Sequence, residues 1–428
     1  MGAARSLGLA IWIGLASLAC SEPEPGRVLV VGIDGASPRL TGPLLRDGAL
    51  PHLAQLAERG IHEKLRSHRP MESPRIWTSM ATGVLPPRHG IHSFGYRDAE
   101  GRHRLFNSTD RQVPALWNIL TAAGRSVGVV NWWNTYPVEV IDGVVVSDHL
   151  LARDIVGRRR ITGAEPGPEG PIAWPPAWNE RVPGILADDT PLTDVENPFT
   201  QAERFPIWTL PERLSERFEN DADVVRLALA IERELHPDVM LVFLPGIDRV
   251  SHVLWAALEP EEVYEEPMPL TPETRAASAD ALYGYYRYTD ALIGRLLEAY
   301  GPDDLVLVVS DHGFEAGQRL AFLTGVHDTD AALDGVVFAA GPGVSTSRGV
   351  RQPSVNDVTP TVLAWLGLPV AMDMDGRPGP FLTVPKIHWI ESHGSTPAGP
   401  KDTRPSGAEE EILDELESLG YIERDDAS

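Results

Sequence analysis

The chain has 428 residues, 43% of them hydrophobic, and its 37 basic and 61 acidic side chains give a formal net charge of −24. This length and composition exclude disorder for most of the chain and allow one large α/β domain with insertions or two smaller domains. The acidic balance argues against sustained attraction to nucleic-acid backbones or anionic lipid surfaces, so we expect no binding of nucleic-acid duplexes.

The first 20 residues have the plan of a secretory signal peptide. Arg5 precedes the apolar segment 7–18, and small residues lead to Cys20, the only cysteine in the sequence. The segment resembles a bacterial lipoprotein signal, which implies a lipid on Cys20 after cleavage, and ordinary cleavage near Ala19 is the alternative. We therefore expect an exported protein, periplasmic or anchored in the envelope, that contacts a membrane only through this lipid. No other stretch is long and apolar enough to span a bilayer.

The segment 27–33 predicts a first buried strand, which ends directly before Asp34 and Gly35. Residues 44–60 follow as an amphipathic helix, and Gly60 is placed to end it. A strand, a helix and a returning strand form the βαβ start of a doubly wound, mostly parallel sheet. The sequence therefore predicts an α/β fold that delivers an acidic side chain at the carboxyl end of its first strand.

Ser73 stands directly before Pro74, and proline suits the first position of a helix. A serine in this place is usually the N-cap of the helix. A helix N-terminus also attracts anions, because its free backbone N–H groups and its dipole both favour negative charge. An oxyanion or phosphate beside Ser73 would therefore be stabilised, and the residues alone leave both interpretations open.

Several motifs in the first quarter of the chain resemble the type I phosphodiesterase and nucleotide pyrophosphatase branch of the alkaline phosphatase superfamily. The resemblance rests on Gly-Ile-Asp-Gly at 32–35, Ser-Pro at 73–74, Trp-Thr-Ser at 77–79, Ala-Thr-Gly at 81–83, Pro86 and His-Gly-Ile at 89–91. In that branch, a Thr or Ser four residues before the Trp-Thr pair is the metal-bound nucleophile, and Ser73 holds that place. The resemblance implies an alkaline-phosphatase-like catalytic domain over 27–382.

The α/β rhythm breaks in the segment 151–211, which is crowded with Pro, Gly, Trp and charged residues and has no sustained period. We interpret this segment as an inserted cap or lid that shapes the substrate pocket. A surface excursion without function is the alternative.

A second predicted strand, 238–244, is followed by Asp248 and His252. These two residues are four positions apart, so both side chains point the same way if the turn is helical, and they can then share one ion. An isolated pair of this kind is more often a helix-surface pair. The pair gains weight because it follows a strand, as Asp34 does.

A third predicted strand begins at Leu305 and ends just before Asp311 and His312. A carboxylate next to an imidazole suits zinc better than calcium or magnesium. Taken alone, the two residues also fit a helix cap and a turn. Because open α/β sheets place their sites at the carboxyl ends of parallel strands, we expect the side chains from all three strands to converge.

The resemblance also implies a complete ligand set for two divalent metal ions, which we expect to be zinc. The family places one further zinc-binding His before a strand like the one that starts at Gly335, and His327 is the candidate. One ion would be held by Asp34, Ser73, Asp311 and His312, and the other by Asp248, His252 and His327.

The resemblance predicts a zinc-dependent phosphoric ester hydrolase that acts on a small-molecule phosphate ester through a phosphoseryl intermediate on Ser73. A phosphodiesterase or nucleotide pyrophosphatase is favoured over a phosphomonoesterase or phosphotransferase of the same superfamily. A sulfatase is less favoured, because its nucleophile is followed by Pro at the second and Arg at the fourth position, whereas Pro74 and Arg75 come one and two residues after Ser73. A non-catalytic envelope lipoprotein is the remaining alternative.

The tail 383–428 is polar and Pro-rich up to its last helical segment, 409–422. That segment has helical spacing of its apolar residues, Ile412, Leu413, Leu416 and Leu419. We expect a short helix that can dock on the domain, and we assign it no chemistry.

Overall fold

The computed structural model describes residues 26–151, 169–266, 269–320, 322–345, 351–394 and 399–422. The expected signal peptide and Cys20 lie outside the described residues, so export and lipidation stay predictions. Among the helices in these ranges, none has the length and apolar character needed to cross a membrane.

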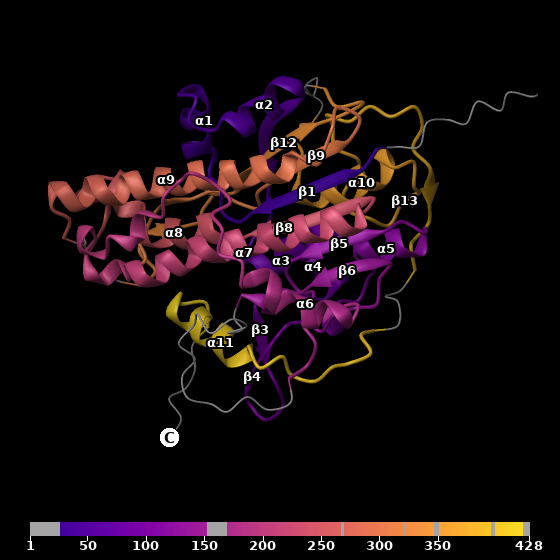
Figure 1. The fold of residues 1–428 in the computed structure, drawn as a ribbon, viewed down its shortest axis with the longest axis horizontal. Coiled ribbons are helices and arrows are strands. Elements are labelled where there is room, and N and C mark those ends of the chain that lie inside the picture. Colours follow the sequence, from indigo (N-terminus) through magenta and orange to yellow (C-terminus); the bar gives the residue numbers. More distant parts are fainter. Residues whose placement is uncertain are drawn as a thin grey trace, which may run out of the picture.

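An eight-stranded sheet with the order β2-β12-β9-β1-β8-β5-β6-β7 forms the centre of the molecule (Figure 1). The pairs β1–β8, β1–β9, β5–β8 and β5–β6 are parallel, whereas β12 and β7 run antiparallel to their neighbours. The prediction of a doubly wound, mostly parallel sheet is confirmed. The strands are β1 (Val28–Ile33), β2 (Ile61–Arg66), β5 (Val127–Val130), β6 (Gly143–Val146), β7 (Ala173–Trp174), β8 (Val239–Leu244), β9 (Leu305–Val309) and β12 (Asp334–Ala340).

Helices cover both faces of the sheet, and the strands at its centre are therefore buried on both sides. On β1, Leu29 and Val31 belong to one apolar core, and Val28 and Val30 belong to the other. The first core contains residues of α1 (Pro38–Arg46), α2 (Pro51–Arg59), α6 (Ala177–Leu186), α7 (Pro211–Leu235), α8 (Gly246–Leu254) and α9 (Pro272–Leu297). The second contains residues of α3 (Ser73–Thr82), α5 (Leu116–Ala122) and α10 (Val358–Trp365).

The register of the central strands brings their carboxyl ends to one edge. Ile33 at the end of β1 pairs with Leu244 at the end of β8, and Gly32 pairs with Val309 at the end of β9. The residues that follow these three strands therefore leave the sheet side by side, as the strand order 9-1-8 requires.

The segment 169–211, the described part of the predicted insertion, contains β7, α6 and three 3-10 turns, and α6 packs on α7. Only Leu151, among the described residues of 151–211, lines the pocket discussed below. The role of this insertion as a cap stays a prediction.

Short elements complete the molecule. They are α4 (Pro86–His89), the antiparallel hairpin of β3 (Gly95–Arg97) and β4 (His103–Leu105), β10 (Glu315–Ala316), β11 (Gly325–Val326), β13 (Val370–Ala371), β14 (Trp389–Ile390) and α11 (Glu409–Ser418). Helix α11 forms within the segment where the sequence predicts a helix, and Figure 1 shows it beside the β3–β4 hairpin.

Candidate active site

The predicted metal ligands lie at the edge where the central strands end. Asp34 directly follows β1, and Asp311 and His312 follow β9. Asp248 and His252 lie on α8, which begins two residues after β8, and both face inward. His327 follows β11. All six side chains are buried, with exposed fractions of 6% or less.

Asp34, Asp311 and His312 form the first group of candidate ligands, and one possible ligand atom from each lies within 4.8 Å of the others. The Nε2 atom of His312 is 3.5 Å from Oδ1 of Asp34 and 3.4 Å from Oδ2 of Asp311. Nδ1 of His312 donates to the Gly313 carbonyl at 3.1 Å, so Nε2 of the neutral ring carries a lone pair. These three atoms have no hydrogen-bond partner within the described part of the chain.

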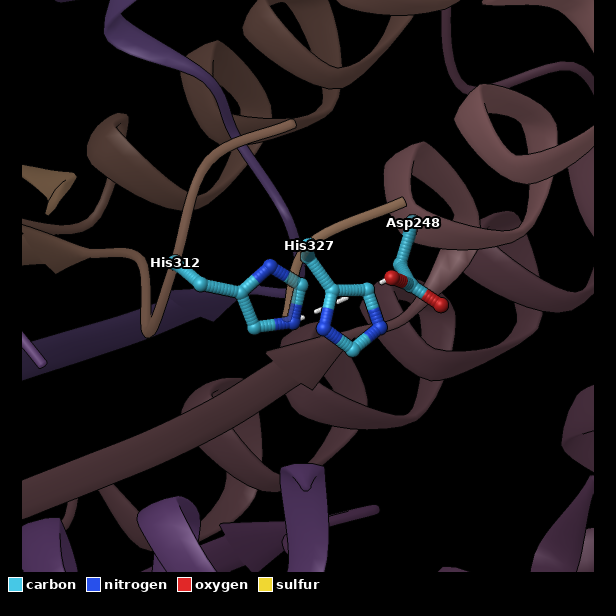
Figure 2. Close-up of side chains that lie close together, drawn as sticks. All are labelled: Asp248, His312 and His327. Carbon is cyan, nitrogen blue, oxygen red and sulfur yellow. Dashed lines mark ion pairs between the residues drawn. The ribbon is translucent and has the colours of Figure 1, made fainter. Parts of the chain in front are cut away.

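Asp248, His312 and His327 form the second group, which Figure 2 shows. Nε2 of His312 is 3.9 Å from Oδ1 of Asp248, and the rings of His312 and His327 stack with centroids 4.0 Å apart. His252 completes the group, because its Nε2 lies 3.5 Å from the same Asp248 oxygen. The sequence assigned His312 to one ion, whereas the structure places it within reach of both groups.

The electrostatics of the two groups fit bound cations. Burial raises the pKa of Asp34 well above its usual value, and the negative charges of Asp311 and Asp248 raise it further. Burial also raises the pKa of Asp311 to about 7 and holds the pKa of His327 well below its usual value. Buried acceptor atoms that face each other without a donor are costly, and a divalent cation among them removes that cost. These carboxylate oxygens and imidazole nitrogens are therefore suitable ligands for divalent metal ions.

Ser73 is the first residue of α3, with Glu72 at the N-cap position and no side-chain cap hydrogen bond. The interpretation of Ser73 as the N-cap is therefore wrong. Its hydroxyl makes no hydrogen bond to any described residue and lines the same pocket as Asp34 and Asp248. Asn134 holds this end of α3, because its Nδ2 donates to the Pro74 carbonyl at 3.1 Å and contacts the Thr78 hydroxyl.

A pocket that is partly open to solvent lies at this edge. Asp34, Ser73 and Asp248 form its polar end. Its walls are mostly apolar and come from the segment around the β3–β4 hairpin, from the loop after β5 and from α11. The wall residues include Phe94, Leu105, Phe106, Trp133, Leu416 and Leu419.

Sequence reasoning missed the C-terminal segment as a part of the site. The hydroxyl of Tyr421 lies 3.0 Å from Nε2 of His252 and 2.7 Å from Nε2 of His327. The helical spacing in 409–422 predicts an apolar face that needs a partner, but nothing in that spacing says which surface it covers. Only the fold brings Tyr421 to histidines that are 169 and 94 residues away.

The family model described as type I phosphodiesterase / nucleotide pyrophosphatase matches residues 28–360. No curated protein matches the chain. A solved 2-O GAG sulfatase is similar, with a TM-score of 0.54 and 13% identity over 85% of this chain and 76% of that chain. A phosphonoacetate hydrolase from Sinorhizobium meliloti aligns with a TM-score of 0.41 and 19% identity over 69% of this chain and 58% of that chain. At 13% identity, the likeness to the sulfatase shows the fold alone.

Proposed function

The chain belongs to the type I phosphodiesterase / nucleotide pyrophosphatase family and is a phosphoester hydrolase, and we propose that it hydrolyses a small phosphodiester with two zinc ions and with Ser73 as the nucleophile. One observation carries this proposal. Two buried carboxylates, Asp34 and Asp248, line the same pocket as Ser73 at the start of α3, and one oxygen of each has no hydrogen-bond partner within the described part of the chain. Nε2 of His312, which also has no such partner, lies 3.5 Å and 3.9 Å from these two oxygens.

Two sets of side chains would hold the ions. Asp34, Asp311 and His312 supply one set, to which the Ser73 hydroxyl adds an oxygen, and Asp248, His252 and His327 supply the other. Mixed oxygen and imidazole ligands in this ratio suit zinc. When bound, two such ions supply Lewis acidity to the attacking and the leaving oxygen of a displacement at phosphorus.

The position of Ser73 supports its proposed role as the nucleophile. Its hydroxyl is free of hydrogen bonds to the described residues and lies where the N–H groups and dipole of α3 stabilise negative charge. After losing its proton to water, the Ser73 oxygen attacks phosphorus and forms a phosphoseryl ester, while the bond to the leaving alkoxide breaks and the alkoxide takes up a proton. Water then attacks the phosphoseryl group, releases the phosphate monoester and returns the Ser73 hydroxyl.

The remaining pocket residues support a substrate with a single charged phosphate. Asp148 and Glu415 add acidic groups to the lining. Arg249, a cationic residue among the described lining residues, pairs with Glu415, and Nδ1 of His149 bonds to the Ser406 hydroxyl at 2.6 Å. The acidic lining residues and the pairing of Arg249 with Glu415 disfavour a polyphosphate. Together with the apolar walls, they favour a diester that carries an apolar group.

The test compares Ser73→Ala and Ser73→Thr with the wild-type enzyme on chromogenic phosphate monoesters, phosphate diesters and sulfate esters in the presence of zinc. We expect the diester to be the best substrate and Ser73→Ala to lose about 10³-fold or more in turnover, because the covalent step is gone. Ser73→Thr should retain part of the activity, since it keeps the hydroxyl.

Thermal unfolding supplies the control for this experiment. Because Ser73 makes no cap hydrogen bond, Ser73→Ala should change stability by less than the roughly 1 kcal/mol of a lost N-cap. Wild-type turnover of the diester by Ser73→Ala would rule out the covalent mechanism, and a preference for sulfate esters would rule out the substrate class.

A further inference from the structure

The C-terminal segment 405–422 reaches the candidate active site through Tyr421. Its Tyr421 hydroxyl bonds to both His252 Nε2, at 3.0 Å, and His327 Nε2, at 2.7 Å. These nitrogens belong to two of the three side chains proposed to hold one metal ion. The structure thus places a phenol oxygen against the atoms that would face the ion.

The hydrogen bonds define how this oxygen is oriented. Nδ1 of His252 donates to the Gly325 carbonyl at 2.9 Å, so Nε2 of the neutral ring carries a lone pair and accepts the Tyr421 proton. His327 then donates from its Nε2 to the Tyr421 oxygen. Within the second ligand group, the Tyr421 hydroxyl therefore presents its proton to His252 and an oxygen lone pair to His327.

Tyr421 is held in this place by contacts on several sides. Glu415 on α11 forms ion pairs with Arg217, at 2.9 Å, and with Arg249. Leu416 is buried, and its carbonyl accepts the Tyr421 backbone N–H at 2.9 Å. These contacts fix the segment as a resident wall of the pocket.

The aromatic ring of Tyr421 is held as well. It packs on Phe94 with ring centroids 4.4 Å apart, and the Arg319 guanidinium lies 4.6 Å from its centroid. Both the ring and the hydroxyl of Tyr421 are therefore fixed beside the second ligand group.

The charges of the two ligand groups also differ. The first group contains the carboxylates of Asp34 and Asp311, whereas Asp248 is the only carboxylate that the second group has for itself. A phenolate would give the second group a second anionic oxygen and would match it to a divalent cation.

We propose that Tyr421 is a further ligand of the metal ion held by Asp248, His252 and His327, supplied by the C-terminal segment. On binding, the Tyr421 O–H bond would break with loss of its proton to solvent, and the His327 ring would carry its proton on Nδ1 in place of Nε2, so that the phenolate oxygen and both Nε2 atoms could face the ion. A catalytic zinc can expand to five ligands in the transition state, which would leave a place for a substrate oxygen. This inference rests on the two-zinc site of the proposed function.

The test uses the full chain, stripped of metal and titrated with zinc in competition with a fluorescent chelator. Tyr421→Phe removes the hydroxyl alone. Tyr288→Phe is the matched control, because Tyr288 is also buried and its hydroxyl bonds to the Phe218 carbonyl, in the contact between α7 and α9. Tyr421→Phe should weaken one of the two zinc sites by at least about 10-fold, a loss that even a group next to a ligand can cause. Tyr288→Phe should bind zinc like the wild type.

A spectroscopic measurement separates a ligand from a mere neighbour. Zinc should produce the ultraviolet difference band of a deprotonated tyrosine in the wild type and in Tyr288→Phe, and this band should be absent in Tyr421→Phe. Absence of the band in the wild type would overturn the proposal even if Tyr421→Phe did not fold.

The direction in which Tyr421→Phe changes the zinc affinity decides whether Tyr421 is a ligand. Unchanged zinc binding in Tyr421→Phe would overturn the proposal, and tighter binding would do so by showing that Tyr421 competes with the ion. A wild-type chain that binds no zinc would instead contradict the two-zinc site of the proposed function, so the two failures can be told apart.

Discussion

Three buried carboxylates surround the imidazole of His312. An oxygen of Asp34, of Asp248 and of Asp311 each lies 3.4–3.9 Å from its Nε2 atom. Such an arrangement is unfavourable in the metal-free protein, because burial and mutual repulsion both oppose the ionised forms. It becomes favourable when cations bind among the oxygens. The site therefore costs stability in the apo form, which is common for functional sites.

Replacing Asp311 with Asn should make this cost visible. Burial raises the pKa of Asp311 to about 7, against an ordinary value of 3.8 for an aspartate side chain. A raised acid pKa means that the folded state binds the proton more tightly, so the destabilisation is fully present above about pH 7 and disappears as the pH falls toward 3.8.

In chelator, Asp311→Asn should therefore raise the free energy of unfolding by about 1–3 kcal/mol at pH 8 and by much less at pH 5. The measurement is thermal unfolding at both pH values. Asp303→Asn, at an exposed position, is the control and should change little at either pH. With zinc present the sign should reverse, because Asp311→Asn loses a ligand. A pH-independent effect would contradict the electrostatic explanation.

Helix α3 and strand β1 together place Ser73 and Asp34 in the lining of one pocket. Trp77 on α3 packs over Gly32 of β1 and also makes edge contacts with Phe243, at 4.7 Å between ring centroids. A Cβ atom on Gly32 would lie 2.4 Å from the Trp77 ring, so glycine is required for this close approach. The relative position of the proposed nucleophile and the first proposed metal ligand thus depends on one contact between two elements.

Gly32→Ala should push α3 away from the sheet and move Ser73 relative to Asp34. We expect a loss of about 1–3 kcal/mol in stability from overpacking. Turnover should fall by about 10²-fold, because a displacement near 1 Å can cost that much. Urea unfolding and steady-state kinetics measure the two effects. Gly42→Ala in α1 is the control, since its Cβ would meet nothing closer than Arg46 at 3.6 Å and alanine favours helix. Normal turnover in Gly32→Ala would show that α3 can shift without harm.

Side chains from distant parts of the sequence meet at one edge of the central sheet. The proposed ligands span positions 34–327 and come from β1, β9, β11 and α8, so bound ions would tie these elements together. Ligands that bind only the native state stabilise it by mass action. Metal binding should therefore be visible in global stability as well as in activity.

Exhaustive chelation should abolish hydrolysis and lower the melting temperature of the whole domain. Zinc should restore both better than magnesium, because three imidazoles are among the proposed ligands. Activity on a diester and differential scanning calorimetry, with metal analysis of each sample, provide the readouts. Full activity in protein that metal analysis shows to be metal-free would contradict the two-zinc proposal.

The sequence alone was sufficient for the sheet and for the convergence of most of the candidate site residues. Buried apolar strands such as β1 and β9 are visible as continuous apolar runs, and the carboxyl ends of parallel strands meet at one edge for any such sheet. Asp34, Asp248 and Asp311 could therefore be expected to converge from local patterns and one topological rule. The motif around Ser73 added the family to this expectation.

Other features depend on contacts between segments that are far apart, and no local pattern contains them. The position of His312 between both ligand groups follows from the loop after β9, where its Nδ1 bonds to the Gly313 carbonyl. The amphipathic spacing of α11 shows that one face must be covered, but docking depends on shape and charge on another surface, here Arg217 and Arg249 around Glu415. Tyr421 reaches the histidines only because that docking occurs, so its place in the site follows from tertiary packing.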